Sequence, residues 1–143
     1  MLTTESPKNI IMVDDDAEDI FLTRTLLKRA GMPAAVTGLN SGEELYNYIK
    51  NNGVGSIDVI LLDINMPIED GFDVLKKLTQ YPDIAELKII MYSTSKRPHE
   101  TSLALKLGAN GFVEKPRRIE DVENLSTVIF EGEHHNTELS EFG

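Results

Sequence analysis

The sequence predicts a doubly wound α/β fold, with a five-stranded parallel sheet in the order 2-1-3-4-5 and helices on both faces. Two observations predict it. Short apolar runs alternate five times with segments of helical periodicity, and the 143 residues suffice for a single domain. Parallel strands need crossover connections, which are right-handed, so the intervening helices cover both faces of the sheet.

The first half of the chain is expected to contain three strands and two helices. The strands are apolar runs, comprising residues 9–13, 35–39 and 58–63. The first helix covers residues 17–30 and has apolar residues at helical spacing, namely Ile20, Phe21, Leu26 and Leu27. Ser41 opens the second helix as its N-cap, and that helix ends near Gly53.

The second half is expected to supply a short helix and two further units of strand and helix. The short helix covers residues 72–78. The strands cover residues 88–92 and 111–114, and the helices cover 98–107 and 119–130, the last with Ile119, Val122, Leu125 and Ile129 on one face. We therefore expect one domain over residues 8–130, followed by an acidic, mobile tail over residues 131–143.

Composition excludes several classes of function. With 14 basic and 24 acidic residues the net charge is −10, which disfavours direct contact with nucleic acid or anionic lipid. The absence of cysteine excludes disulfides and thiol catalysis. Residues 1–8 do not resemble a leader, and no apolar run approaches the roughly 18 residues of a membrane span, so a cytoplasmic location without membrane insertion is expected.

Polar residues at the ends of the predicted strands carry the candidate chemistry, because sites in open parallel sheets form at the carboxyl ends of strands. The strands deliver Asp14, Asp15 and Asp16 (first), Asp63 (third), Ser93 and Thr94 (fourth) and Lys115 (fifth). The strand order places the acidic residues beside Asp63. Carboxylates this close raise one another's pKa unless a cation neutralises them, and Mg²⁺ suits a site of few carboxylates.

Four segments occur in a characteristic order: VDDD at 13–16, LLDINMP at 61–67 with Gly71, MYST at 91–94 and GANGFVEKP at 108–116. Together they resemble the receiver domains of response regulators, in particular the chemotaxis-type single-domain regulators with a flavodoxin-like fold. The resemblance covers roughly residues 8–130. It implies a stand-alone bacterial two-component regulator that takes a phosphoryl group from a histidine kinase and catalyses only its own phosphorylation and dephosphorylation.

The resemblance also implies a role for each matching residue. Asp63 is the expected phosphoacceptor, and Ser93 and Lys115 are expected to contact the phosphoryl group. The expected Mg²⁺ ligands are Asp14, Asp15, Asp63 and the backbone carbonyl of Asn65.

Signalling is expected to follow from the phosphoryl group, which attracts the Ser93 hydroxyl. Phe112, at the aromatic switch position of the family, then enters the vacated space and repacks the face formed by the fourth helix, fifth strand and fifth helix. An unidentified protein target, or a second copy of the chain, is expected to bind this face. Residues 17–19 and 81–87 additionally resemble the single-domain regulators that partner bacterial phytochrome kinases.

Two other classes of function fit parts of the sequence. Asp14 and Asp16 match the aspartate pattern of haloacid-dehalogenase-like phosphatases, with Asp14 as nucleophile. Those enzymes need a further acidic motif at a strand end, whereas Glu120 and Asp121 begin the last predicted helix. A purely structural domain would have lost Asp63, Lys115 or the acidic pair, and all are present.

Some of the polar residues also have ordinary structural explanations. Asp16 is a suitable N-cap for the first helix. His99 fits a helix surface, and His134 and His135 lack the third ligand that a metal site needs.

Overall fold

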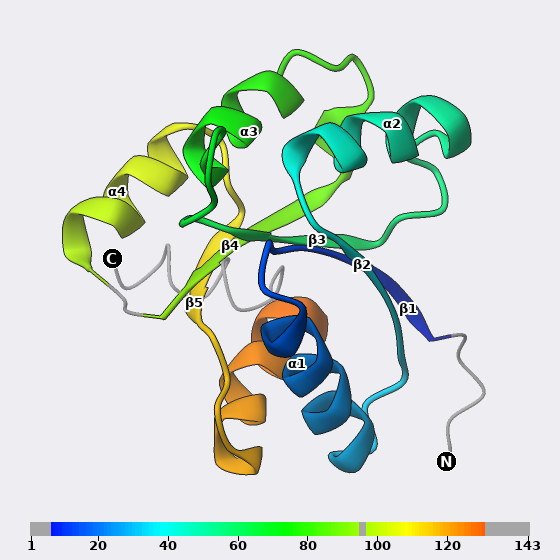
Figure 1. Ribbon diagram of the computed structural model, residues 1–143, viewed down its shortest axis with the longest axis vertical. Coiled ribbons are helices and arrows are strands. Elements are labelled where there is room, and N and C mark those ends of the chain that lie inside the picture. The colour runs from blue at the N-terminus through cyan, green and yellow to red at the C-terminus, as the bar shows by residue number, and fades with distance from the viewer. Residues whose placement is uncertain (1–6, 95–96, 131–143) are drawn as a thin grey trace, which may run out of the picture.

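The computed structural model describes residues 7–94 and 97–130, and its sheet has the strand order β2-β1-β3-β4-β5 with parallel pairing throughout (Figure 1). The strands are β1 (Lys8–Val13), β2 (Ala34–Leu39), β3 (Val59–Asp63), β4 (Lys88–Ser93) and β5 (Gly111–Glu114). The predicted fold class and strand order are confirmed, and each predicted strand boundary lies within one residue of the observed one.

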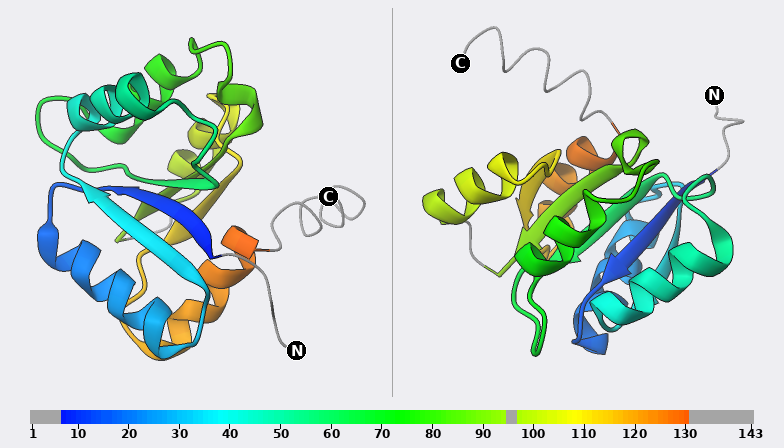
Figure 2. Two further views of the ribbon diagram at one scale, coloured as in Figure 1. Left: turned by 90° about the vertical axis from the view of Figure 1, so that its right-hand side faces the viewer. Right: turned by 90° about the horizontal axis from the view of Figure 1, so that it is seen from above.

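Helices cover both faces of the sheet. They are α1 (Ala17–Arg29), α2 (Gly42–Asn52), α3 (Gly71–Leu78), α4 (Pro98–Lys106) and a helix over residues 122–130. Figures 1 and 2 show α1 and the helix at 122–130 on one face and α2, α3 and α4 on the other. Within the described residues, no helix has the length and apolar character needed to cross a bilayer.

The side chains of the strands contribute to two apolar layers, one on each face of the sheet. Along β1, Ile10 and Met12 pack with α1 and the helix at 122–130, whereas Ile11 and Val13 pack with α2 and α3. Because both faces are covered, the central strands are apolar on both sides, and β3 is buried along its whole length.

Polar groups are rare in this interior, and their positions locate the site. The buried polar residues of the described chain are Asp14, Thr23, Asp63 and Ser93. Three of the four lie at the carboxyl end of a strand or directly after it. The sheet therefore directs its buried polar side chains to one edge.

Side-chain capping explains where α1, α2 and α3 begin. The side chains of Asp16, Ser41 and Asp70 each accept a backbone N–H in the first turn of α1, α2 and α3. Asp73 completes a capping box with Asp70. The N-cap roles expected for Asp16 and Ser41 are thus confirmed.

Two apolar residues of the predicted helices are exposed, and the prediction that Ile119 begins the last helix is wrong. Phe21 is 66% exposed, because α1 buries the face that carries Ile20 and Leu27, and the next residue along a helix is rotated by about 100°. Ile119 is 47% exposed and belongs to a 3-10 turn, Ile119–Asp121, rather than to an α-helix. This turn is held by the Asp121 carboxylate, which accepts the backbone N–H groups of Arg117 and Arg118.

A second 3-10 turn, Ile84–Glu86, precedes β4. The predicted tail over residues 131–143, which includes His134 and His135, lies outside the described residues. The division into a domain over 8–130 and a tail therefore stays a prediction.

Candidate functional site

Three carboxylates meet at the ends of β1 and β3. One oxygen from each of Asp14, Asp15 and Asp63 lies within 4.8 Å of the other two. Asp14 and Asp63 are buried, and Asp15 is exposed. Because β1 and β3 are neighbours in the sheet, the structure brings together the acidic residues that the predicted strand order placed side by side.

Burial makes a negative charge on Asp63 unfavourable. It is the largest of the effects that together raise the pKa of Asp63 from 3.8 to about 7. The Lys115 ammonium opposes the shift and the charge of Asp14 adds to it, while the backbone N–H of Asn65, which donates to Asp63 Oδ1 at 3.3 Å, lowers the pKa. The ionised form of Asp63 is therefore less favourable at this position than in water.

Lys115, directly after β5, reaches the acidic group with its long side chain. Its Nζ lies 2.8 Å from Asp19 Oδ2, 3.1 Å from Asp14 Oδ2 and 3.4 Å from Asp63 Oδ1. Burial lowers the pKa of Lys115, but the surrounding carboxylates more than offset this and leave the pKa above its usual value. The side chain therefore bridges β5 to β3 as a charged ammonium, as its length and position in the sequence predicted.

Asp19 is a site residue that was not predicted from the sequence. It lies in the segment 17–19, whose resemblance to certain single-domain regulators gave it no role in the site. It accepts the shortest of the three contacts from Lys115. A signal was present, because Asp19 lies in the first turn of α1, the helix that begins beside the acidic cluster.

Tyr92 is a second site residue that the sequence analysis missed. It is fully buried in β4, and its hydroxyl donates to Asp14 Oδ2 at 2.6 Å. Burial raises the pKa of this phenol far above its usual range, so it remains a donor. Its ring lies 5.1 Å from the Lys115 ammonium, within range of a cation–π interaction.

The other oxygen of Asp14 is also engaged. Asp14 Oδ1 accepts the backbone N–H of Asp16 at 2.9 Å. Together with the bond from Tyr92, this contact fixes the orientation of a carboxylate that is wholly buried.

Ser93 and Asn65 lie where the sequence predicted them. Ser93 ends β4 and is 1% exposed, and its backbone carbonyl accepts the N–H of Lys115 at 2.7 Å. This bond joins the ends of β4 and β5 that carry the two residues. Asn65 is exposed, two residues after Asp63, whereas Thr94 is exposed beyond the end of β4.

Gly71 lets α3 begin directly against the loop that follows Asp63. A Cβ at position 71 would overlap the carbonyl oxygen of Asp63 and lie 2.8 Å from Ile64 Cα. Both are backbone atoms, which cannot move aside without displacing the loop. The N–H of Gly71 also donates to the carbonyl of Ile64 at 2.8 Å. Close approach of the backbone therefore accounts for glycine at this position.

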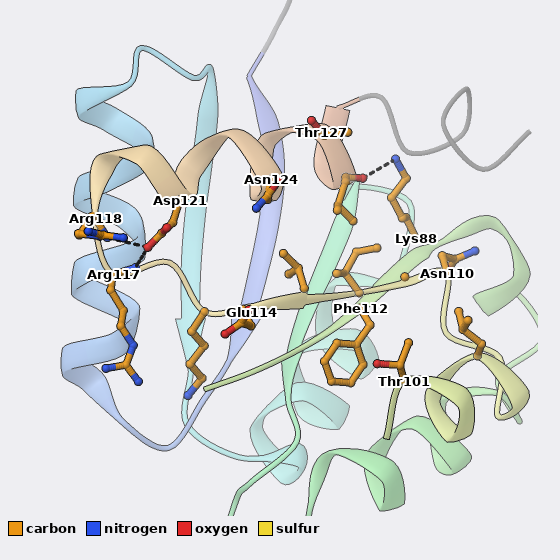
Figure 3. Close-up of a pocket in the computed structure, with 16 residues that line it drawn as sticks. Lys88, Thr101, Asn110, Phe112, Glu114, Arg117, Arg118, Asp121, Asn124 and Thr127 are labelled. Atoms are coloured by element: carbon orange, nitrogen blue, oxygen red, sulfur yellow. Dashed lines mark hydrogen bonds between the residues drawn. The ribbon is translucent and has the colours of Figure 1, made fainter. Parts of the chain in front are cut away.

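Phe112 borders a pocket of about 840 Å³ that is lined by residues of α4, β5 and the helix at 122–130. Figure 3 shows Phe112 with other lining residues, among them Thr101 of α4 and Asn124. Phe112 is 7% exposed and belongs to the apolar layer that includes Ala104. A buried ring beside free volume has room to change its rotamer, and the switch itself stays a prediction.

Two of the acidic residues considered for the phosphatase alternative, Asp16 and Asp121, have other roles in the structure. Asp16 caps α1 by accepting the N–H of Glu18 at 2.9 Å, and Asp121 holds the turn before the last helix. In the described residues, neither is part of the acidic group at Asp63. His99 is exposed on α4, as expected.

The acidic group fits a divalent cation. Three carboxylate oxygens within 4.8 Å of one another can contact a single ion, and Mg²⁺ prefers oxygen ligands. Burial is the main cause of the raised pKa of Asp63, so a cation beside this carboxylate would favour its ionised form. Asp14, Asp15 and Asp63 are the side chains that would hold the ion, while the carbonyl of Asn65 stays a predicted ligand.

The response regulator receiver domain model matches residues 10–126. Response regulator GtcR of Aneurinibacillus migulanus is 36% identical over 110 residues, which are 76% of this chain and 42% of GtcR. Response regulator Rcp1 of Synechocystis sp. is 27% identical over 120 residues, which are 81% of this chain and 82% of Rcp1. The chain thus spans less than half of the length of GtcR but most of that of Rcp1.

Solved structures agree with these sequence matches. The Mn²⁺-bound form of Rcp1 has a TM-score of 0.69 at 25% identity, covering 87% of this chain and 94% of the other. The phosphorylated cyanobacterial phytochrome response regulator RcpA has a TM-score of 0.72 at 24% identity, again over 87% and 94%, and this likeness supports the fold alone. Because the family model matches most of the chain, residues 10–126, the chain belongs to the response regulator receiver domain family.

Proposed function

We propose that Asp63 accepts a phosphoryl group from the phosphohistidine of a histidine kinase, in a Mg²⁺-dependent reaction, and that the chain signals through a protein-binding face. The observation that carries the proposal is the buried Asp63 carboxylate, which shares one site with two further carboxylates and the Lys115 ammonium. Membership of the receiver domain family supports the same reaction, since receiver domains are phosphorylated by histidine kinases.

The transfer is a displacement at phosphorus. An oxygen of the ionised Asp63 carboxylate attacks the phosphorus, the P–N bond to the kinase histidine breaks, and its electron pair stays on the imidazole nitrogen. The product is an acyl phosphate. Hydrolysis returns the protein to its unphosphorylated state. Attack by water breaks the P–O bond to Asp63, which regenerates the carboxylate and releases inorganic phosphate.

The neighbours of Asp63 have complementary roles in this proposal. Lys115, with Nζ 3.4 Å from Asp63 Oδ1, offsets the charge on the transferring group, and the Ser93 hydroxyl contacts a phosphoryl oxygen. The metal ligands are Asp14, Asp15, Asp63 and the carbonyl of Asn65. When bound, Mg²⁺ supplies positive charge that favours the ionised form of Asp63 and reduces its repulsion from the phosphoryl group.

The proposed signal is a population shift. Ser93 moves toward the phosphoryl group, Phe112 enters the vacated space, and the face formed by α4, β5 and the helix at 122–130 repacks. The location of Phe112 supports this step, because its buried ring borders the pocket between α4, β5 and the helix at 122–130. A target protein or a second copy of the chain then binds the repacked face.

The finer features of the predicted function belong to this proposal too. We infer a regulator in the bacterial cytoplasm, whose only catalysis is its own phosphorylation and dephosphorylation. A kinase of the phytochrome type is supported by the segments at 17–19 and 81–87, which resemble those of the single-domain regulators that partner such kinases.

The experiment is incubation with acetyl phosphate and Mg²⁺, followed by intact mass measurement. We expect one labile phosphoryl adduct, lost in Asp63→Asn and absent when a chelator removes the metal. Rapid turnover of phosphomonoesters that survives Asp63→Asn but is abolished by Asp14→Asn would instead favour the phosphatase.

The switch has a separate test. Phe112→Ala should leave adduct formation intact and weaken binding of the phosphorylated protein to its target. Unchanged binding would remove Phe112 from the signalling mechanism.

A further inference from the structure

We propose that Asp19 is a positioning residue, which draws the Lys115 ammonium away from Asp63 and so keeps the phosphoacceptor available to a metal ion. This inference rests on the proposed function. Asp19 lies outside the group of three carboxylates that fits the metal, so its role acts through Lys115.

The contacts of the ammonium support this role. An ammonium has three N–H donors, and here three carboxylates surround it. The 2.8 Å contact to Asp19 has the length of a charge-assisted hydrogen bond, whereas the 3.4 Å contact to Asp63 is longer than the usual 2.7–2.9 Å of such a bond. Of the three carboxylates, that of Asp19 in α1 therefore lies closest to the ammonium, and that of Asp63 lies farthest from it.

The surroundings hold both partners of this contact in place. Asp19 is part of the first turn of α1, whose start is fixed by the N-cap Asp16 and whose inner face is buried through Ile20 and Leu27. The Tyr92 ring lies beside the ammonium, 5.1 Å from Nζ. With side-chain exposures of 10% for Lys115 and 32% for Asp19, the pair is only partly screened by solvent.

The consequence concerns competition for Asp63. A divalent cation and the ammonium are both attracted to the charge on Asp63, so a closer ammonium opposes binding of the cation. Without the Asp19 carboxylate, Lys115 keeps Asp14 and Asp63 as partners and moves toward them. Asp14 cannot follow the ammonium, because its two oxygens are held by Asp16 and Tyr92.

The test compares Asp19→Ala with Glu18→Ala. Glu18 is an exposed acid in the same helical turn, so its removal causes the same loss of charge and of helix-dipole stabilisation. Calorimetric titration with Mg²⁺ alone should show affinity reduced about five-fold in Asp19→Ala relative to Glu18→Ala. Asp19→Glu, which restores a carboxylate within reach of the long lysine side chain, should recover most of the affinity.

Two further measurements distinguish positioning from a structural role. The Mg²⁺ concentration that gives half the maximal rate of phosphorylation by acetyl phosphate should rise in Asp19→Ala more than the maximal rate falls, because saturating Mg²⁺ displaces the ammonium from Asp63. A crystal structure of metal-free Asp19→Ala should show the distance from Lys115 Nζ to Asp63 Oδ1 shortened from 3.4 Å to about 2.8 Å.

Equal Mg²⁺ affinities for Asp19→Ala and Glu18→Ala, or an unchanged distance from Lys115 to Asp63, would overturn the inference. Asp19→Asn, which keeps the shape of the side chain, replaces the alanine variant if circular dichroism shows that the latter is unfolded. The failure of the proposed function is distinguishable, because a wild-type protein that gains no phosphoryl group would refute that function while the Mg²⁺ titrations still test Asp19.

Discussion

Replacing Asp63 by Asn should stabilise the metal-free protein at about pH 8, by up to about 4 kcal/mol in the free energy of unfolding. The reason is that the folded protein disfavours the ionised carboxylate. Burial is the main cause that raises the pKa of Asp63 from 3.8 to about 7, with Lys115 opposing the shift and Asp14 adding to it. Three pKa steps of about 1.36 kcal/mol each give the magnitude.

The sign of the pH dependence follows from proton counts. Well below a pH of about 4 Asp63 is protonated in both states, and its ionisation has no effect on stability. Between about pH 4 and 7 the unfolded chain binds fewer protons than the folded one, so the stability contribution of Asp63 falls as the pH rises. Asn does not titrate, and the difference between variant and wild type should therefore grow from about pH 4 to 7 and then level off.

The assay is urea denaturation followed by circular dichroism across this pH range, with a chelator present. Asp83→Asn is the matched control, because Asp83 is exposed and its side chain makes no capping hydrogen bond. Added Mg²⁺ should stabilise the wild type and have little effect on Asp63→Asn. A variant no more stable than wild type at about pH 8, or a difference that does not depend on pH, would refute the electrostatic reasoning.

Three further substitutions test a buried hydrogen bond, a close backbone approach and a strained backbone conformation. Tyr92→Phe should lower the free energy of unfolding by about 1.5–3 kcal/mol, because the buried Asp14 carboxylate loses a charged hydrogen bond, and thermal unfolding that matches wild type would contradict this. Gly71→Ala should destabilise the protein by more than about 2 kcal/mol, because the added Cβ overlaps the backbone of Asp63. An unchanged denaturation midpoint would show that the loop after Asp63 can move to accommodate the methyl group. Ile68→Asn should stabilise the fold by up to about 1 kcal/mol, because Ile68 is fully exposed and its φ of 70° is better tolerated by asparagine. A lower stability of this variant in urea denaturation would argue against backbone strain at position 68.

The sequence was sufficient to predict the sheet and its main site residues. Short apolar runs such as residues 58–63 are typical of buried strands, and the strand order then determines which strand ends are neighbours. Asp14, Asp15, Asp63 and Lys115 were found in this way, because each lies at or just after the end of a strand.

The contacts around Lys115 were beyond that reasoning. Tyr92 lies in the apolar run of β4 and has the pattern of a core residue, and its function depends on a hydroxyl that meets Asp14 from a distant part of the chain. Asp19 looks like an ordinary acid in the first turn of a helix. The role of Asp19 depends on where the long Lys115 side chain ends, and that of Tyr92 on a contact with a residue that follows another strand. Periodicity determines neither.

Exposure within a helix was also predicted less well than the helix itself. Phe21 is apolar and next to a buried residue, but helical geometry turns it to solvent. At Ile119, two backbone N–H groups bound by Asp121 stabilise a 3-10 turn that an apolar pattern cannot reveal.

Chemical trapping of the modified residue tests the central claim most directly. After incubation with acetyl phosphate and Mg²⁺, borohydride reduces an aspartyl phosphate to homoserine, and peptide mass spectrometry then identifies the altered position. We predict homoserine at position 63, with Asp14 and Asp15 unmodified. Homoserine at another aspartate, or none in a protein that has gained a phosphoryl group, would contradict the assignment of Asp63 as the phosphoacceptor.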